Sequence, residues 1–197
     1  MAVFAGYVDL RIAVADHVGN RNISDVMSRL TQAAEAWLNQ KLRAREQITM
    51  DTVTFTSGVG ALPADYLEMI ALYDTSGRYP LTQGTLQEVK RVNSPYWRYA
   101  IDGSSVYLYG VTGSRNIEYY ASLPTISASA TGSNWLLQKY PNVYLYAVGL
   151  EAAKFLRDAE LTQATAALLQ GAMNDLKIDD ERAQWGNGAV RLQMQTP

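Results

Sequence analysis

Apolar positions recur at helical spacing through the first third of the chain. Tyr7, Leu10, Val14 and Val18 share one helical face, and Gly19-Asn20 is typical of a helix end. Asn22 is suited to cap a second helix, which the pattern extends to about Arg43. Its apolar stripe is Ile23, Val26, Leu30, Ala33 and Trp37, flanked by Met27, Ala34 and Leu38. We expect these two helices to pair as an antiparallel hairpin.

The period changes to two in the middle third. Val53 and Phe55 alternate with threonines in "DTVTFT", which indicates a half-buried strand. In "GALPADYLEMIALY" (60–73), Pro63 suits the first turn of a short helix, and "IALY" indicates a strand attached to it. Further along, the pattern predicts a strand, turn and strand over 70–83, two helical turns over 85–92, a hairpin over 97–110 with Asp102-Gly103 in its turn, and a strand over 115–124.

The last third is helical again after a polar loop over 125–134. Ser133 is expected to cap a short helix, and Pro141 to begin the next one. That helix, over 141–158, is apolar nearly all round, which is typical of a helix buried on more than one side. A final helix is expected over about 161–183. Its stripe is Leu161, Ala164, Leu168, Ala172 and Leu176.

These elements predict an α+β fold in a single domain over residues 1–185. Helices occupy 1–45 and 133–185, and a β-rich insertion with short helices occupies 51–123. We therefore expect a helical bundle, built from the N-terminal helix pair and two long C-terminal helices, with a small antiparallel sheet inserted in it. Residues 186–197 are expected to form an extended C-terminal tail.

Composition narrows the possible functions. Seventeen Lys and Arg against nineteen Asp and Glu give a formal charge of −2, which argues against a dedicated nucleic-acid binder. The absence of cysteine excludes disulfides, thiolate zinc sites and cysteine nucleophiles. We expect no signal peptide and no membrane span, because no run approaches the ~20 apolar residues that a bilayer requires.

Candidate catalytic groups are few. His17 is the single histidine and is expected to make a core or subunit contact, and no G-x-S-x-G motif accompanies it. "GVTGSR" (110–115) shares only its glycines with a phosphate loop. Asp175 and Asp179 can share a helical face and bridge a divalent cation, but a solvated face is the favoured interpretation. Acid pairs drawn from Glu88, Asp102 and Glu118 carry no specific signal. We expect no enzyme, no cofactor and no metal site.

The C-terminal tail shows a strand rhythm without a local partner. Val190, Leu192 and Met194 alternate with polar residues. Burying three such side chains contributes roughly 5–8 kcal/mol gross, and ordering the segment costs a similar amount. One tail therefore binds weakly, whereas several tails in a ring bind firmly. A frayed terminus is the alternative interpretation.

Four segments, in this order, resemble the head-to-tail adaptor (connector) proteins of tailed bacteriophages. They are "LPADYLEMIALY" (62–73), "YAIDGSSVYLY" (99–109), "IEYYASLPTIS" (117–127) and "NWLLQKYPNVYLYAVGLEAAKFLRD" (134–158). The order of the segments carries the resemblance, which covers residues 51 to about 158. The helical N-terminus and the tail fit the same architecture.

The resemblance implies a ring, typically of twelve subunits, that docks beneath the portal and joins it to tail or nozzle and neck proteins. DNA would only pass through the lumen, and a near-neutral wall is compatible with that passage. The protein would be made in the host cytoplasm and reside in the virion neck. Val190, Leu192 and Met194 would pair with a strand of the portal. The tyrosines of the hairpin, Tyr99, Tyr107 and Tyr109, would face a neighbouring subunit or the next tail component.

Three other interpretations stay open at the level of sequence. The chain could be another neck or tail-completion protein that uses the same interaction logic. It could be a small cell-wall hydrolase that uses an acid pair, or a host cytosolic α+β protein without an assembly role.

Overall fold

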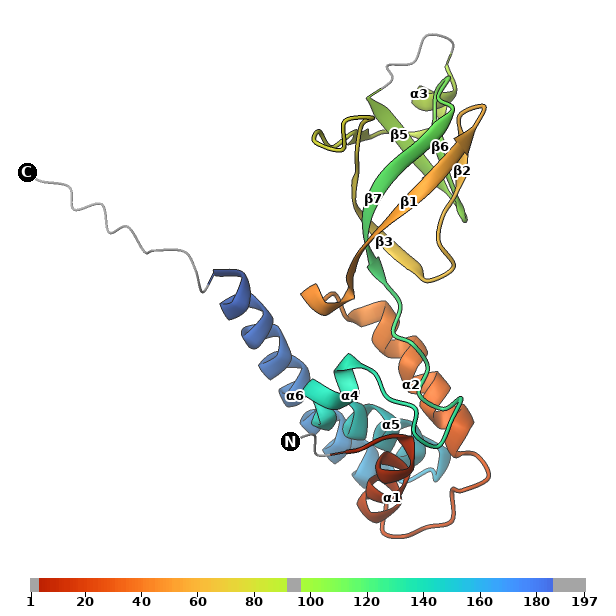
Figure 1. The fold of residues 1–197 in the computed structure, drawn as a ribbon. Helices are drawn as coiled ribbons and strands as arrows, with labels where there is room; N and C mark the ends of the chain where they lie inside the picture. The colour runs from red at the N-terminus through yellow and green to blue at the C-terminus, as the bar shows by residue number, and fades with distance from the viewer. Residues whose placement is uncertain (1–3, 92–96, 186–197) are drawn as a thin grey trace, which may run out of the picture. The chain divides into compact units, whose positions relative to one another are not determined.

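The computed structural model describes residues 4–91 and 97–185, and its contacts divide the chain into two compact units (Figure 1). The helical unit combines Met1–Leu42 with Pro124–Pro197, and the sheet unit is Arg43–Leu123. In the sequence, the sheet unit lies between the two parts of the helical unit, and it begins before residue 51. The single domain over 1–185 stays a prediction.

The described part of the helical unit contains five α-helices. They are α1 (Tyr7–His17), α2 (Met27–Lys41), α4 (Trp135–Lys139), α5 (Pro141–Phe155) and α6 (Ala159–Trp185). After α1 the chain turns at Gly19 and Asn20, whose φ angles of 74° and 55° lie in the left-handed region that ends a helix. The predicted stop of the first helix is confirmed. The cap of α4 is Asn134 and not Ser133, since the Asn134 side chain accepts a hydrogen bond from Leu137 N at 3.0 Å.

Helix α5 is the centre of the helical unit. Helices α1, α2, α4 and α6 all pack against it, and Val148, Ala152 and Ala153 are fully buried. Burial of this helix on several sides is thereby confirmed. The predicted α1–α2 hairpin is wrong, because within the described residues each of these helices packs chiefly on α5 and not on the other. Because α5 is apolar nearly all round, α1 and α2 can each bury more apolar surface against α5 than against each other.

Two predicted stripes are rotated by about one position. The buried line of α2 contains Leu30 of the predicted stripe together with the flanking residues Met27, Ala34 and Leu38, whereas Ala33 is exposed. Residues 24–26 form turns before the helix, so Ile23 and Val26 do not share its register. In α6, Thr165, Leu169 and Leu176 are buried, while Ala164 and Leu168 face outward.

The sheet unit contains a seven-stranded sheet within the described residues, and this sheet is larger than the small one that we expected. Its strands are β1 (Ile48–Thr56), β2 (Val59–Ala61), β3 (Tyr66–Leu72), β4 (Thr82–Gln83), β5 (Arg98–Asp102), β6 (Ser105–Leu108) and β7 (Gly113–Ala121). The order is β3-β7-β1-β2-β6-β5-β4, and every pair except β4–β5 is antiparallel. Near the outer edges, Leu81 N donates to Leu72 O at 2.7 Å, so the sheet curls back on itself.

The inner face of the sheet forms one apolar core. Val53 and Phe55 are buried while the intervening threonines are exposed, so the alternation predicted for this strand is confirmed. The core is completed by Leu72, Tyr99, Val106, Leu108, Ile117 and Tyr119. The hairpin of β5 and β6 is also confirmed, with Gly103 at φ 57° as the first of two turn residues between the paired Asp102 and Ser105.

Of the two short helices predicted in the sheet unit, one is absent and the other is present. The short helix expected at Pro63 is wrong: Pro63 O accepts from Tyr66 N at 3.1 Å in a turn that leads directly into β3. Asp65 then accepts a hydrogen bond from Tyr119 OH at 3.0 Å and serves the sheet. The helical turns expected after residue 84 are present as α3 (Leu86–Lys90), which Thr85 caps through Glu88 N.

Candidate interaction surfaces

The predicted tyrosine surface is divided by the alternation of strand β6. Val106 and Leu108 point into the core, so Tyr107 between them points to the other face, which α3 partly covers. Tyr107 and Tyr109 line one hollow of about 610 Å³ together with Val59, Val89 and Lys90. Lys90 Nζ lies 4.6 Å from the centroid of the Tyr107 ring, in a cation–π arrangement.

Tyr99 lies elsewhere in the sheet unit. It is only 4% exposed and belongs to the core, opposite Leu108 in the β5–β6 register. Burial raises the pKa of its phenol. Tyr99 therefore has little surface to offer a partner in this structure, whereas Tyr109 is 38% exposed. An interface role stays a prediction for these tyrosines, and the structure gives it a surface at Tyr107 and Tyr109.

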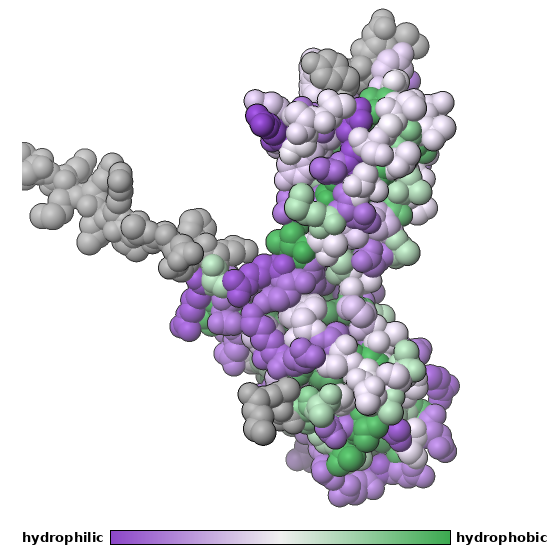
Figure 2. All heavy atoms as spheres, in the orientation of Figure 1, coloured by the Kyte–Doolittle hydropathy of each residue, from purple (hydrophilic) through white to green (hydrophobic). Residues whose placement is uncertain are grey.

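The sequence analysis did not identify a second hollow, on the helical unit. This groove of about 330 Å³ lies between α1 and the segment that leads into α2. Val8 and Ile12 form one side, and the buried Ile23 and Met27 contribute to its lining. Figure 2 shows apolar residues gathered over α1 and bordered by hydrophilic ones. The signal was present in the sequence, because Val8 and Ile12 are apolar residues on the face of α1 opposite to Leu10 and Val14.

Helix α6 has an exposed C-terminal end. Leu176 is its last buried side chain among the described residues, and Ile178 beyond it is 37% exposed. Asp175 and Asp179, the candidate cation pair, both lie on this part of α6. Within the described residues, no group of three or more His, Cys, Asp and Glu side chains could hold a metal ion. Asp179 accepts a hydrogen bond from Tyr140 OH.

A buried polar network in the helical unit was also missed. Glu35 is 5% exposed, and its Oε1 accepts hydrogen bonds from Ile126 N at 2.9 Å and from Tyr144 OH at 2.7 Å. Asn134 Nδ2 donates to Pro124 O at 2.9 Å and to Tyr144 OH at 3.2 Å. Burial, and then the nearby Glu35, raise the pKa of Tyr144. The network attaches the loop after Pro124 to α2 and α5.

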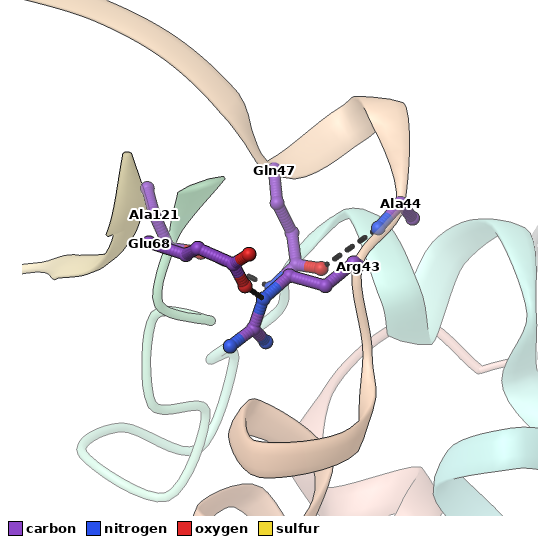
Figure 3. A network of polar contacts seen from close by, with 5 residues as sticks. All are labelled: Arg43, Ala44, Gln47, Glu68 and Ala121. Atoms are coloured by element: carbon purple, nitrogen blue, oxygen red, sulfur yellow. Dashed lines mark hydrogen bonds and ion pairs between the residues drawn. The ribbon is translucent and has the colours of Figure 1, made fainter. Parts of the chain in front are cut away.

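A corresponding network lies at the two ends of the sheet unit (Figure 3). Gln47 Oε1 accepts from Ala44 N at 3.0 Å, and its Nε2 donates to Ala121 O at 3.1 Å. Arg43 Nε donates to Glu68 Oε2 at 2.7 Å, and the Arg43 guanidinium lies 5.9 Å from the centroid of the Tyr120 ring. The first and last segments of the sheet unit are thus tied to each other.

His17 makes its contacts inside the helical unit. Its Nε2 lies 2.9 Å from Thr165 Oγ1, and its ring stacks at a tilt on Tyr146 with centroids 5.8 Å apart. Burial lowers the pKa of His17, which favours the neutral imidazole. This placement fits the expected core contact.

Two further expectations concern the termini and membranes. Val190, Leu192 and Met194 lie outside the described residues, so their pairing with the portal stays a prediction. Among the described residues, no helix combines the length and the apolar character needed to cross a bilayer.

Comparison with known proteins gives one family. A model of the SU10 adaptor protein family matches residues 5–193, which is nearly the whole chain. No curated protein matches the chain significantly.

Proposed function

Because this chain belongs to the SU10 adaptor protein family, and is therefore a structural adaptor protein of bacteriophages, we propose that it joins the head of the virion to the tail. In this proposal several copies form a ring that docks on the portal, and the tail or neck proteins attach beneath it. The family match over residues 5–193 carries the proposal. The ring of about twelve subunits is the form that the resemblance to head-to-tail adaptors implies.

The charge of the chain supports a passive role toward DNA. A formal charge of −2 over 197 residues gives no excess of cations to hold the phosphate backbone. A strongly basic wall would bind DNA by releasing its counterions and would oppose its passage. We therefore propose that DNA passes through the lumen without being retained there.

We propose two contacts with the virion partners. Residues 186–197 follow α6 and contain Val190, Leu192 and Met194, which we propose add as a strand to the portal. Tyr107 and Tyr109 lie in a hollow with Lys90, and tyrosine is one of the residue types that carry most of the binding energy at protein interfaces. We propose that this hollow contacts the next tail component.

We also propose that the protein acts by assembly alone and is not an enzyme. The described polar groups support this: His17 is hydrogen-bonded to Thr165, and Glu35 to Tyr144 and Ile126. Each has a partner that serves the packing of the helical unit. Loss of a peptidoglycan-cleaving activity on replacement of His17 would contradict this part of the proposal.

Electron microscopy of the protein mixed with the portal of its phage tests the function directly. We expect class averages with a ring of this protein on the portal, and isolated portal rings would refute the docking. A variant lacking residues 186–197 should lose most of the attachment, because the strand-forming residues are removed. Replacement of the same segment by a Gly-Ser segment of equal length is the matched control for chain length, and undiminished attachment would refute the role of the tail.

A further inference from the structure

The helical unit carries two exposed surfaces whose charges are complementary. One is the groove on α1, which contains arginines and lies near the start of α6, and the other is the acidic C-terminal end of α6. We propose that the groove on α1 of one copy binds the C-terminal end of α6 of a neighbouring copy. This inference rests on the proposed ring and names the contact that closes it. The groove is the surface lined by Val8, Arg11, Ile12, Arg21, Ile23 and Met27.

The groove has an apolar interior that the chain itself leaves open. Its lining includes Ile23 and Met27, which are 4% and 2% exposed, while Val8 and Ile12 at its side are 42% and 58% exposed. Apolar side chains this exposed on a helix are typical of a surface that becomes covered on association. A volume of about 330 Å³ accommodates apolar side chains from one face of a partner helix.

The charge around the groove selects an acidic partner. Arg11 and Arg21 line it, and no acidic residue does. Arg21 is paired with Asp158 at 2.9 Å, but Arg11 has no carboxylate partner within the described residues and lies 5.9 Å from the centroid of the Tyr7 ring. A carboxylate that approaches Arg11 would therefore gain an ion pair without breaking one.

The end of α6 has the matching character. Ile178 is 37% exposed, and Asp175 and Glu181 lie three residues before and after it, on neighbouring positions of the same helix surface. Between residues 175 and 182 four carboxylates accompany two cations. Figure 1 shows this end of α6 extending beyond α1, α4 and α5. It is an acidic helix end with one exposed apolar side chain at its centre.

A copy cannot place the end of α6 in its own groove. Arg21, beside the groove, is bonded to Asp158 at the start of α6. Ile178 lies nineteen residues after Ala159 in the same continuous helix, or about 30 Å further along its axis at 1.5 Å per residue. The occupant must therefore come from another copy. Because groove and helix end are different surfaces, the contact is head-to-tail and can repeat around a ring.

Charge reversal tests the pairing. Arg11→Glu and Asp175→Arg should each raise the dissociation constant between copies by at least about tenfold, because each brings like charges together. The double variant Arg11→Glu/Asp175→Arg should recover association. An equimolar mixture of the two single variants should recover it as well, because an alternating ring contains only complementary contacts. Arg29→Glu, on the exposed face of α2 outside the groove, is the matched control and should associate as the wild type does.

Cysteine cross-linking tests the geometry, because the natural chain contains no cysteine. A variant with both Ile12→Cys and Ile178→Cys should give a ladder of disulfide-linked oligomers under oxidation. A mixture of the two single variants should give heterodimers and no ladder. Both positions are exposed, so circular dichroism should show unchanged folding.

The outcomes separate this contact from the proposed function. A ring on the portal without disulfide links between the two introduced cysteines, or with charge reversals that have no effect, overturns the contact and leaves the docking intact. Links and charge rescue without portal binding support the contact and refute the docking. Cross-linking of the groove cysteine to the portal alone, or the absence of any self-association up to the highest soluble concentration, also overturns the contact.

Discussion

Replacement of Glu35 by alanine should destabilise the helical unit by about 4 kcal/mol. Glu35 is 5% exposed and accepts two hydrogen bonds, from Ile126 N at 2.9 Å and from Tyr144 OH at 2.7 Å. Alanine leaves both donors buried without that partner, and each unmet buried donor costs roughly 1–3 kcal/mol. Domains of this size are stable by only about 5–15 kcal/mol, so the loss is a large fraction of the total.

Urea unfolding followed by tryptophan fluorescence measures this change. Three of the four tryptophans, Trp37, Trp135 and Trp185, belong to the helical unit, so the signal reports mainly on it. Gln32→Ala is the matched control, because Gln32 lies on the exposed side of the same helix and its loss should change stability by less than about 0.5 kcal/mol.

A double-mutant cycle identifies the hydrogen bond itself. Tyr144→Phe removes the hydroxyl and should cost about 1–2 kcal/mol, since Asn134 keeps its bond to Pro124 O. In the combined Glu35→Ala/Tyr144→Phe variant the stranded hydroxyl is absent, so the total loss should fall short of the sum by roughly 1 kcal/mol. Strict additivity, or a Glu35→Ala variant as stable as Gln32→Ala, would show that the network does not stabilise the fold as argued.

Three further substitutions test the packing of two glycines and the pH dependence of stability. Gly149→Ala should lower the free energy of unfolding by about 1–3 kcal/mol, because the added Cβ would lie 2.9 Å from His17 Cδ2. Gly171→Ala should raise it by about 1 kcal/mol through helix propensity, because no atom lies within 4 Å of the added Cβ. Urea midpoints of the two variants that move in the same direction would contradict the packing argument. Burial, and then the hydrogen bond to Asp65, raise the pKa of Tyr119 to about 12, so the stability that its neutral phenol contributes is present below pH ~10 and is lost as the pH rises from there towards 12. Tyr119→Phe should therefore flatten the fall in urea midpoint over that interval, and an unchanged slope would count against a buried neutral phenol.

Local patterns in the sequence predicted most element types but not all of the faces. The alternation around Val53 and Phe55, the hairpin at Gly103 and the stop at Gly19-Asn20 depend on neighbouring residues, and the structure confirms them. The stripe of α2 was misplaced because turns at 24–26 delay the helix, and no local signal marks that delay. Pro63 fits a helical first turn and a tight turn equally well, and long-range pairing of β3 with β7 decides for the turn.

Long-range contacts explain what the sequence could not show about the surfaces. From the sequence alone Glu35 would be placed on the solvent-facing side of its helix. The structure buries it because Ile126 and Tyr144, which are distant in sequence, donate hydrogen bonds to it. Tyr99, Tyr107 and Tyr109 belong to one tyrosine-rich hairpin, but Tyr99 falls on the inner face and Tyr107 on the outer face of the sheet. The groove at Val8 and Ile12 required the fold of the segment around Ile23, although the apolar residues themselves were visible in the sequence.

The bridge that Gln47 makes between Ala44 and Ala121 has an evolutionary consequence. A chain segment whose first and last residues meet behaves as a cassette: it can lengthen, shorten or be exchanged as a whole while the host fold continues across the gap. We therefore expect other members of this family to vary most within the segment that corresponds to residues 43–123 and to keep the helices that surround the insertion in the sequence. Alignment breaks within the family should accordingly cluster next to Leu42 and Pro124, and not inside α5.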